Sequence, residues 1–242
     1  MKRSHGVNSD APLVLSYFQQ GCLVLAINRP DHLNAWSAAI STEIAGKLLQ
    51  VEPDPAAKAV VITGTGDSAF SVGQVVDDGA SLACLIRCYE TIRSFSKPIV
   101  AAVNGDADGV GFCITQLCDV AIGHSNVEIG LKPTGCRTQG TFGAWLLWER
   151  IGRRAVEPLL HGRLFTACEA QHLGLLHQVV DSDSLLHDSV EVALRLSSKP
   201  PLAYSLSKKA ICAMTEDRYA NALLQEAGLY TTPAWSERQV TH

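Results

Sequence analysis

Three glycines and two aspartates lie together in the segment 105–111, GDADGVG, between two apolar stretches. The apolar run 98–103 before it is too short for a membrane span and ends at an Asn-Gly pair, which is typical of a buried strand. The apolar residues that follow have a spacing that suits one face of a helix. A glycine-rich turn between a strand and a helix leaves backbone N–H groups free at the start of the helix. Such groups suit an anion or a developing oxyanion.

The spacing of these glycines does not fit the common nucleotide-binding motifs. Gly105, Gly109 and Gly111 are spaced GxxxGxG, which differs from the dinucleotide fingerprint GxGxxG, and no GxxxxGK[ST] segment occurs. Asp106 and Asp108 flank the turn, and two interpretations of them remain open. They could be catalytic carboxylates, or they could serve the local hydrogen bonding that aspartate provides in turns.

Length and composition indicate a globular protein, either one large α/β domain or a core domain with a smaller appendage. Of the 242 residues 47% are hydrophobic and 18% are charged, and the net charge is −4. This balance gives no basic footprint for nucleic acid. No stretch approaches the length of a membrane span, and the apolar piece near the N-terminus is too short for a secretory signal. We therefore expect a cytoplasmic protein with neither a nucleic-acid nor a membrane partner.

The eight cysteines and eight histidines form no recognisable metal or disulfide pattern. The cysteines are spread through apolar segments without a CxxC pair, which favours reduced thiols in a cytosolic protein. The histidines form no HExxH motif or similar cluster. The sequence predicts no metal site.

Strands and helices alternate around the glycine segment. Apolar runs at 13–16 and 22–28 predict an opening hairpin, and a loop follows. From Ser37 the spacing is helical, with Ser37 or Ser41 as the cap, and this helix should end before Pro53. A strand at 59–63, a loop at 70–73, a helix at 82–95 and the strand at 98–103 complete a β-α-β alternation. It implies a sheet with parallel pairs and right-handed crossovers.

The last third of the chain is mostly helical. Thr166 and Glu169 have the spacing of a capping box, and Gly174 is the expected C-cap of the same helix. A loop is expected at 130–140. The further short strands are expected at 120–122, 127–129 and 179–180, and the further helices at 144–151, 156–160, 185–196, 205–214 and 216–229.

Six segments, taken in order, resemble the successive signatures of the crotonase superfamily, which includes the enoyl-CoA hydratases and isomerases. They span roughly residues 14–211. The resemblance implies an α/β fold, a crotonase-like spiral of ββα units over residues 1–190. It also implies a helical C-terminal region, 191–242, that drives assembly into a homotrimer or a dimer of trimers. The segments are NRPDHLNAWS, VVITGTGDSAFSVGQ, SKPIVAAVNGDADGVGF, CDVAIGHSNVEIG, HGRLFTACEAQHLGLLHQVVD and KPPLAYSLSKKAI.

The resemblance also implies a substrate and a binding mode. The substrate would be an acyl thioester of coenzyme A or of an acyl carrier protein, with coenzyme A as part of the substrate and no separate cofactor. Two backbone N–H groups, of Val72 and Val110, would hold the thioester oxygen as an enolate forms, and losing one such donor typically costs about 10²–10³ in rate. Valine keeps the donor but adds bulk and stiffness. The residues implied in substrate binding are Arg29, His32, Leu33, Gly73, Gln74, Gly111 and Lys208; for Lys208, solvated helix surface is the alternative.

The chain departs from the family pattern where an acid and a base are expected. Cys113 stands in the place of one glutamate of the hydratases, and the segment IGLKPTG lacks the Pro-Glu pair that carries the other. Val75 replaces an aspartate that often follows the first loop. Hydration needs a group that activates water and a group that protonates the α-carbon. Decarboxylation, which forms the enolate without a base, or double-bond isomerisation is therefore favoured over ordinary hydration.

Three residues remain as further catalytic candidates. Cys113 could be a nucleophile or weak acid, or a buried structural cysteine, since nothing in the sequence lowers the pKa of its thiol. Glu128 could turn toward the site or face solvent. Arg137 lies, with Cys136 and Gln139, in the variable loop where relatives of other activities place their own catalytic groups. The alternative to an enzyme is a non-catalytic homologue that binds a thioester or serves as an assembly module.

Overall fold

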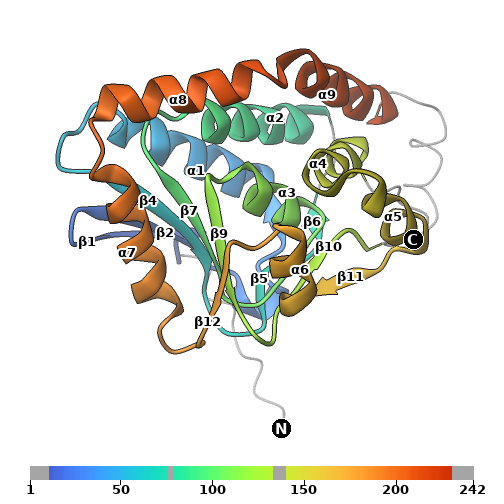
Figure 1. The fold of residues 1–242 in the computed structure, drawn as a ribbon, viewed down its shortest axis with the longest axis horizontal. Helices are drawn as coiled ribbons and strands as arrows, with labels where there is room; N and C mark the ends of the chain where they lie inside the picture. The colour runs from blue at the N-terminus through green and yellow to red at the C-terminus, as the bar shows by residue number, and fades with distance from the viewer. Residues whose placement is uncertain (1–10, 76–78, 133–139, 231–242) are drawn as a thin grey trace, which may run out of the picture.

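The computed structural model describes residues 11–75, 79–132 and 140–230 (Figure 1). Within these ranges it holds a six-stranded, a four-stranded and a two-stranded sheet. Helices cover both faces of the six-stranded sheet, and the last two helices, α8 (Pro201–Ala213) and α9 (Glu216–Tyr230), run across the outside of the molecule (Figure 1). The mixed α/β architecture expected from the sequence is confirmed.

The six-stranded sheet opens with an antiparallel hairpin and continues as parallel strands. Gln20 and Gly21 in the hairpin turn have φ of 54° and 85°, the left-handed pair that matches the twist of hairpin strands. The strands Cys22–Ile27 and Ala59–Gly64 are buried over their whole length, as expected where helices cover both faces of a parallel sheet. In spatial order the strands are β1 (Val14–Gln19), β2 (Cys22–Ile27), β4 (Ala59–Gly64), β7 (Ile99–Val103), β9 (Val120–His124) and β12 (Gln178–Val180).

Three of the four short strands in the four-stranded sheet each follow a strand of the large sheet. β5 (Ala69–Ser71) follows β4, β8 (Asp106–Asp108) follows β7, and β10 (Glu128–Gly130) follows β9. These three pair in parallel, and β11 (Leu164–Thr166) closes the edge in the antiparallel direction. A helix comes after each step, so the chain repeats the ββα unit that the resemblance implied. The two-stranded sheet joins β3 (Trp36–Ser37) to β6 (Gln74–Val75).

The helices bury the two faces of the large sheet unequally. The larger apolar core lies on the side of α1 (Ala38–Val51), α2 (Gly79–Ser94) and α3 (Val110–Leu117), and a smaller core lies under α7 (Leu185–Ser197). The outer helices α8 and α9 pack on α2, and α9 also packs on α4. The remaining helical segments are η1 (Pro30–His32), α4 (Thr141–Ile151), η2 (Gly152–Ala155), α5 (Val156–His161) and α6 (Ala167–Leu173).

The predicted helix caps are present. The Ser37 hydroxyl accepts a hydrogen bond from the Ile40 N–H at 3.3 Å, so Ser37 and not Ser41 caps α1. Thr166 and Glu169 form the reciprocal capping box of α6, and Gly174 ends that helix with a φ of 79°. These local signals worked because each depends on residues within one turn of the helix end.

Some boundaries differ from the sequence prediction. Residues 69–71 and 106–108, expected within loops, form β5 and β8, because strands of three residues show no alternating pattern and depend on pairing with distant segments. The helix expected to start at 205 begins at Pro201, whose missing N–H is tolerated in the first turn. Of the loop expected at 130–140, residues 133–139 lie outside the described part of the chain.

The expected division near residue 190 falls inside α7. This helix packs on strands β4 and β7 of the large sheet, whereas α8 and α9 pack on other helices. Over the described ranges no helix combines the length and the apolar character needed to cross a bilayer.

Candidate active site

The two glycine loops of the sequence meet at a contact between Gly111 and Ser71. A methyl group on Gly111 would lie 2.1 Å from the Ser71 carbonyl oxygen, so only glycine allows this approach. Ser71 ends β5, which pairs with β8, and Gly111 lies in the first turn of α3. Val72 and Val110, the chain neighbours of these two residues, therefore lie on adjoining turns.

The second loop presents a donor at the start of a helix. Val110 is buried and is the first residue of α3, and Gly109 before it has a φ of 60° and provides no side-chain cap. The first turn closes only at Cys113, whose N–H donates to the Gly109 carbonyl at 3.0 Å. No residue in the described part of the chain accepts a hydrogen bond from the Val110 N–H. This group therefore points out of the positive end of the helix dipole and suits an oxyanion.

The first loop differs because its donor has a partner within the chain. The Val72 N–H donates to the Leu33 carbonyl oxygen at 3.0 Å. A ligand oxygen can reach this N–H only by displacing the Leu33 carbonyl. The assignment of Val72 as an oxyanion donor therefore stays a prediction. It requires that the Leu33 carbonyl oxygen first moves away from the Val72 N–H.

Asn34 holds the Leu33 carbonyl in place. Leu33 and Asn34 have φ of 51° and 52°, a left-handed conformation that non-glycine residues adopt at a cost. The buried Asn34 side chain donates to the carbonyls of Ala69 at 2.7 Å and Thr65 at 3.0 Å, and it accepts from the Arg29 N–H at 2.9 Å. Three hydrogen bonds of one buried side chain stabilise the turn that occupies the Val72 donor.

The Cys113 thiol lies one helical turn beyond Val110 and is buried. A methyl group on Gly143 would lie 3.3 Å from its sulfur, and the Tyr89 hydroxyl hydrogen-bonds to it. Burial raises the pKa of the Cys113 thiol far above its ordinary value. Of the two interpretations left open by the sequence, the buried structural cysteine fits this environment, because a reactive thiol needs a lowered pKa.

The structure separates Asp106 from Asp108, which the sequence left equivalent. Both lie on β8, and each accepts a hydrogen bond from the backbone of the neighbouring segment: Asp106 from the Glu128 N–H at 2.9 Å, Asp108 from the Lys132 N–H at 2.8 Å. Asp106 is partly exposed, but Asp108 is only 4% exposed. Burial raises the pKa of the Asp108 carboxyl above its ordinary value, although the Lys132 and Gly109 N–H groups oppose this.

Comparison with known proteins identifies the fold and the family. The sequence model of the family "Enoyl-CoA hydratase/isomerase" matches residues 17–240. The chain belongs to the enoyl-CoA hydratase/isomerase family. A crotonyl-CoA hydratase from Syntrophomonas wolfei is 33% identical over 198 residues, which are 77% of this chain and 76% of that protein.

Solved structures of family members superpose on the chain. An enoyl-CoA hydratase from Mycobacterium avium subsp. paratuberculosis has a TM-score of 0.79 at 30% identity, covering 95% of this chain and 98% of that one. A monofunctional enoyl CoA isomerase from M. smegmatis has a TM-score of 0.76 at 28% identity, covering 89% and 99%. The crotonase fold expected from the sequence is confirmed.

The other catalytic candidates gain little support from their surroundings. Glu128 on β10 is exposed and contributes its backbone N–H to Asp106, so its side chain faces solvent. Arg137, Cys136 and Gln139 lie outside the described residues. Their roles stay predictions.

The residues expected to bind substrate fall into three groups. His32 and Leu33 are exposed beside the first loop, with Leu33 at 47%, and Arg29 donates to the Ala35 carbonyl at 3.1 Å. Lys208 is different: it is 10% exposed at its side chain and donates to the Asp119 carboxylate at 3.0 Å. Solvated helix surface therefore does not describe Lys208, and a phosphate would have to compete with Asp119. Gly73 and Gly111 shape the two loops, and of Gln74 only the backbone pairing in β6 is described.

One buried carboxylate near the site escaped the sequence analysis. Glu226 of α9 is 8% exposed and accepts hydrogen bonds from the Phe142 N–H at 3.2 Å and the Thr141 hydroxyl at 3.0 Å. It therefore caps the start of α4, whose own N-cap, Gly140, provides no side chain. No local signal could reveal this cap, because the partners are more than eighty residues apart in the sequence.

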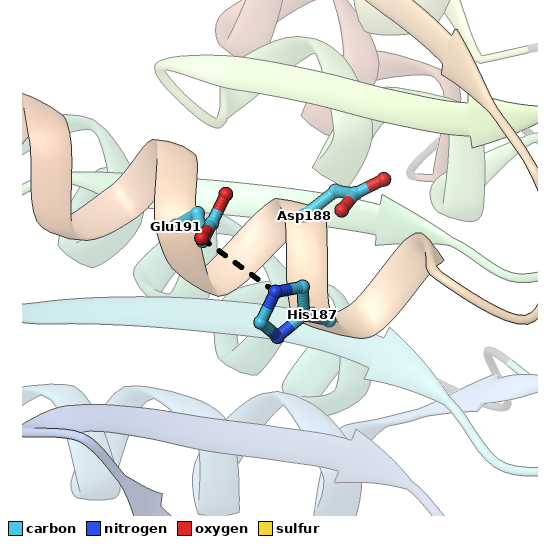
Figure 2. Close-up of side chains that lie close together, drawn as sticks. All are labelled: His187, Asp188 and Glu191. Atoms are coloured by element: carbon cyan, nitrogen blue, oxygen red, sulfur yellow. Dashed lines mark ion pairs between the residues drawn. The ribbon is translucent and has the colours of Figure 1, made fainter.

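A group of possible metal ligands lies on α7, across the large sheet from the glycine loops. One ligand atom each from His187, Asp188 and Glu191 falls within 4.8 Å of the others (Figure 2). His187 and Glu191 are an exposed pair one turn apart at 3.5 Å, and Asp188 accepts from the Ser184 hydroxyl at 2.7 Å. Exposed pairs of this spacing are ordinary helix surface.

Proposed function

We propose that this protein binds an acyl thioester of coenzyme A and stabilises its enolate between the two glycine loops, catalysing decarboxylation or double-bond isomerisation and not ordinary hydration. The observation that carries the proposal is the contact of Gly111 with Ser71, which brings Val72 and Val110 onto adjoining turns. Enolate formation develops charge on one oxygen, and fixed backbone donors in a water-poor site are effective at stabilising it.

The groups around Val110 favour chemistry that needs little acid–base assistance. Hydration needs one group to activate water and another to protonate carbon. Cys113 is a poor base because burial holds its thiol in the neutral form and raises its pKa. Glu128 faces solvent. Decarboxylation forms the enolate without a base, and isomerisation needs only one group that moves a proton.

Coenzyme A is the favoured carrier of the acyl group, with an acyl carrier protein as the alternative. The relatives whose names give a substrate act on coenzyme A thioesters, such as the crotonyl-CoA hydratase. The exposed residues His32 and Leu33 offer a surface beside the first loop for the nucleotide part of the thioester. No separate cofactor is required by this chemistry.

The outer helices support assembly into a homotrimer or a dimer of trimers. Four large apolar side chains of α8 and its C-terminal end are exposed, which is unusual for a surface that remains in water. They are Leu202, Leu206, Ile211 and Met214.

The cysteines of the described residues are all free, in keeping with a cytoplasmic protein.

A non-catalytic homologue is the second candidate, and one observation favours it. The Val72 N–H is already bonded to the Leu33 carbonyl, so only one of the two donors is available without rearrangement. Such a protein would bind a thioester, or serve as an assembly module, without turning the thioester over.

A mass-spectrometric screen tests these alternatives. The purified protein is incubated with enoyl, β-keto, malonyl-type and glutaconyl-type CoA thioesters, and product and bound ligand are recorded together. Loss of CO₂ or a shifted double bond supports the proposal. Binding without conversion supports the non-catalytic homologue, and hydration of a simple enoyl-CoA at the rate of an ordinary hydratase contradicts the proposed reaction class.

A further inference from the structure

Asp106 and Asp108 form a matched pair in which only Asp108 is buried. They lie on the same strand, two residues apart, and each ties β8 to the neighbouring segment through one backbone N–H. Both therefore tie β8 to the segment beside it, and the Gly109 N–H also bonds to the Asp108 carboxyl. Burial distinguishes them, because Asp108 is almost completely removed from solvent and Asp106 is not.

Asp108 lies where the second loop meets the start of α3. It precedes Gly109, the cap of α3, and is two residues from Val110, whose N–H has no acceptor among the described residues. Its partner Lys132 follows Leu131, and Leu131 and the Cys113 sulfur both lie within 3.3 Å of the position a methyl group on Gly143 would take. The carboxyl group thus lies where the second loop meets the segment after β10, two residues along the chain from the proposed oxyanion donor.

The other buried carboxylate in this region has a different task. Glu226 accepts hydrogen bonds from the first turn of α4 and thereby holds α9 against it. Asp108 accepts from the Lys132 N–H and bonds to the Gly109 N–H, and it does not hold a second helix in place as Glu226 does. An aspartate that only tied two strands together would do so as well at an exposed position, as Asp106 does.

We propose that Asp108 is the proton donor of this site, giving its carboxyl proton to the α-carbon of the enolate held at Val110. The inference rests on the proposed function, because it supplies the proton that enolate chemistry requires. The raised pKa of Asp108 is consistent with this role, since it favours the protonated form that can donate.

For a carboxylated thioester, the Asp108 proton replaces the carboxylate on the α-carbon. The bond between the α-carbon and the carboxylate breaks, CO₂ leaves, and the bonding electron pair enters the enolate. The α-carbon then forms a C–H bond with the Asp108 proton, leaving an aspartate carboxylate. Water returns a proton to Asp108, so the net change is the uptake of one proton and the loss of CO₂.

The test uses methylmalonyl-CoA in D₂O, with CO₂ release and the configuration of deuterium at the α-carbon of the propionyl-CoA product measured separately. The wild type and D106N, the matched control, are expected to give one enantiomer. D108N keeps an oxygen that accepts the Lys132 N–H but has no carboxyl proton, so it is expected to release CO₂ and give racemic deuteration. A D108N product of one enantiomer overturns the role of Asp108. Should D108N fail to fold, as judged by its melting temperature, Asp108→Ser takes its place.

A second measurement separates failure of this inference from failure of the proposed function. If the wild type releases no CO₂, the decarboxylation part of the proposed function is overturned. Exchange of the α-protons of butyryl-CoA with D₂O then tests Asp108 directly. Exchange in the wild type and D106N, slowed about 10²-fold or more in D108N, supports the proton donor. Equal exchange in D108N, or no exchange in the wild type, overturns it.

Discussion

The two glycine loops differ in whether the N–H group proposed to bind the oxyanion already has a hydrogen-bond acceptor. The loop at Val110 is buried, begins a helix, and leaves its N–H without an acceptor among the described residues. The loop at Val72 is partly exposed and bonds its N–H to the Leu33 carbonyl. One of the two proposed oxyanion donors is therefore available without rearrangement, and the other is already bonded within the chain.

The difference follows from what holds each loop. A helix start has free N–H groups by its geometry, so the Val110 donor needs no further support. The Val72 donor follows a three-residue strand and lies beside a left-handed turn that Asn34 stabilises. We infer that a ligand engages Val110 first and that its full engagement requires displacement of the Leu33 carbonyl.

The largest effect is expected where the two loops touch. Gly111→Ala places a methyl group 2.1 Å from the Ser71 carbonyl oxygen, a backbone atom that cannot move cheaply. We expect a loss of at least about 3 kcal/mol in the free energy of unfolding, measured by urea denaturation. Gly46→Ala on the open face of α1, where a methyl group meets nothing within 4 Å, is the control and should be stabilising by about 0.5–1 kcal/mol. A mild effect at Gly111 would contradict the close approach of the loops.

Proline substitutions distinguish the two donors. Val110 is the first residue of α3, a position that accepts proline, so Val110→Pro removes the donor with a stability change below about 1 kcal/mol. We expect it to slow turnover about 10²–10³-fold. Val72→Pro also removes the bond to Leu33, so it should abolish turnover and lower stability by about 1 kcal/mol while assembly persists. Full activity in either variant would contradict the assignment of that residue as an oxyanion donor.

A pH series tests the buried state of Asp108. Because burial raises the pKa of this carboxyl, the folded protein binds its proton more tightly than the unfolded chain. The stability of the wild type should therefore fall relative to D108N as the pH rises from about 3.9, the ordinary aspartate pKa, through the raised pKa. The difference amounts to about 1.4 kcal/mol for each unit that separates the two pKa values. D106N, followed by the same denaturation curves, should not show this trend.

The smallest effect is expected at the turn that closes the first loop. Leu33→Gly relieves a left-handed conformation but increases the freedom of the unfolded chain, and these terms oppose each other. We expect thermal denaturation to show a net change within about 0.5 kcal/mol. A loss of more than about 2 kcal/mol would mean that the exposed Leu33 side chain, and not the Asn34 hydrogen bonds, holds the turn.

Sequence reasoning succeeded where the signal is local. The Ser37 cap, the Thr166 and Glu169 capping box and the apolar strands 59–64 and 99–103 depend on residues within a few positions of each other. The spiral itself came from the resemblance, since three-residue strands such as 106–108 carry no periodic pattern of their own.

The features of the site that escaped prediction all join distant segments. The Val72 to Leu33 bond spans 39 positions and depends on an unfavourable backbone conformation that composition does not reveal. The burial of Asp108 depends on how β8 meets the segment after β10, so the sequence could not distinguish it from Asp106. The capping of α4 by Glu226 likewise arises only once α9 has packed.

The most direct test of a two-loop oxyanion site is a crystal structure with a non-hydrolysable butyryl-CoA analogue. The account predicts that the thioester oxygen lies about 2.7–3.1 Å from the Val110 nitrogen and from the Val72 nitrogen, with the Leu33 carbonyl displaced. A bound analogue whose carbonyl oxygen lies away from Val110, with the Val72 N–H still bonded to Leu33, would contradict it.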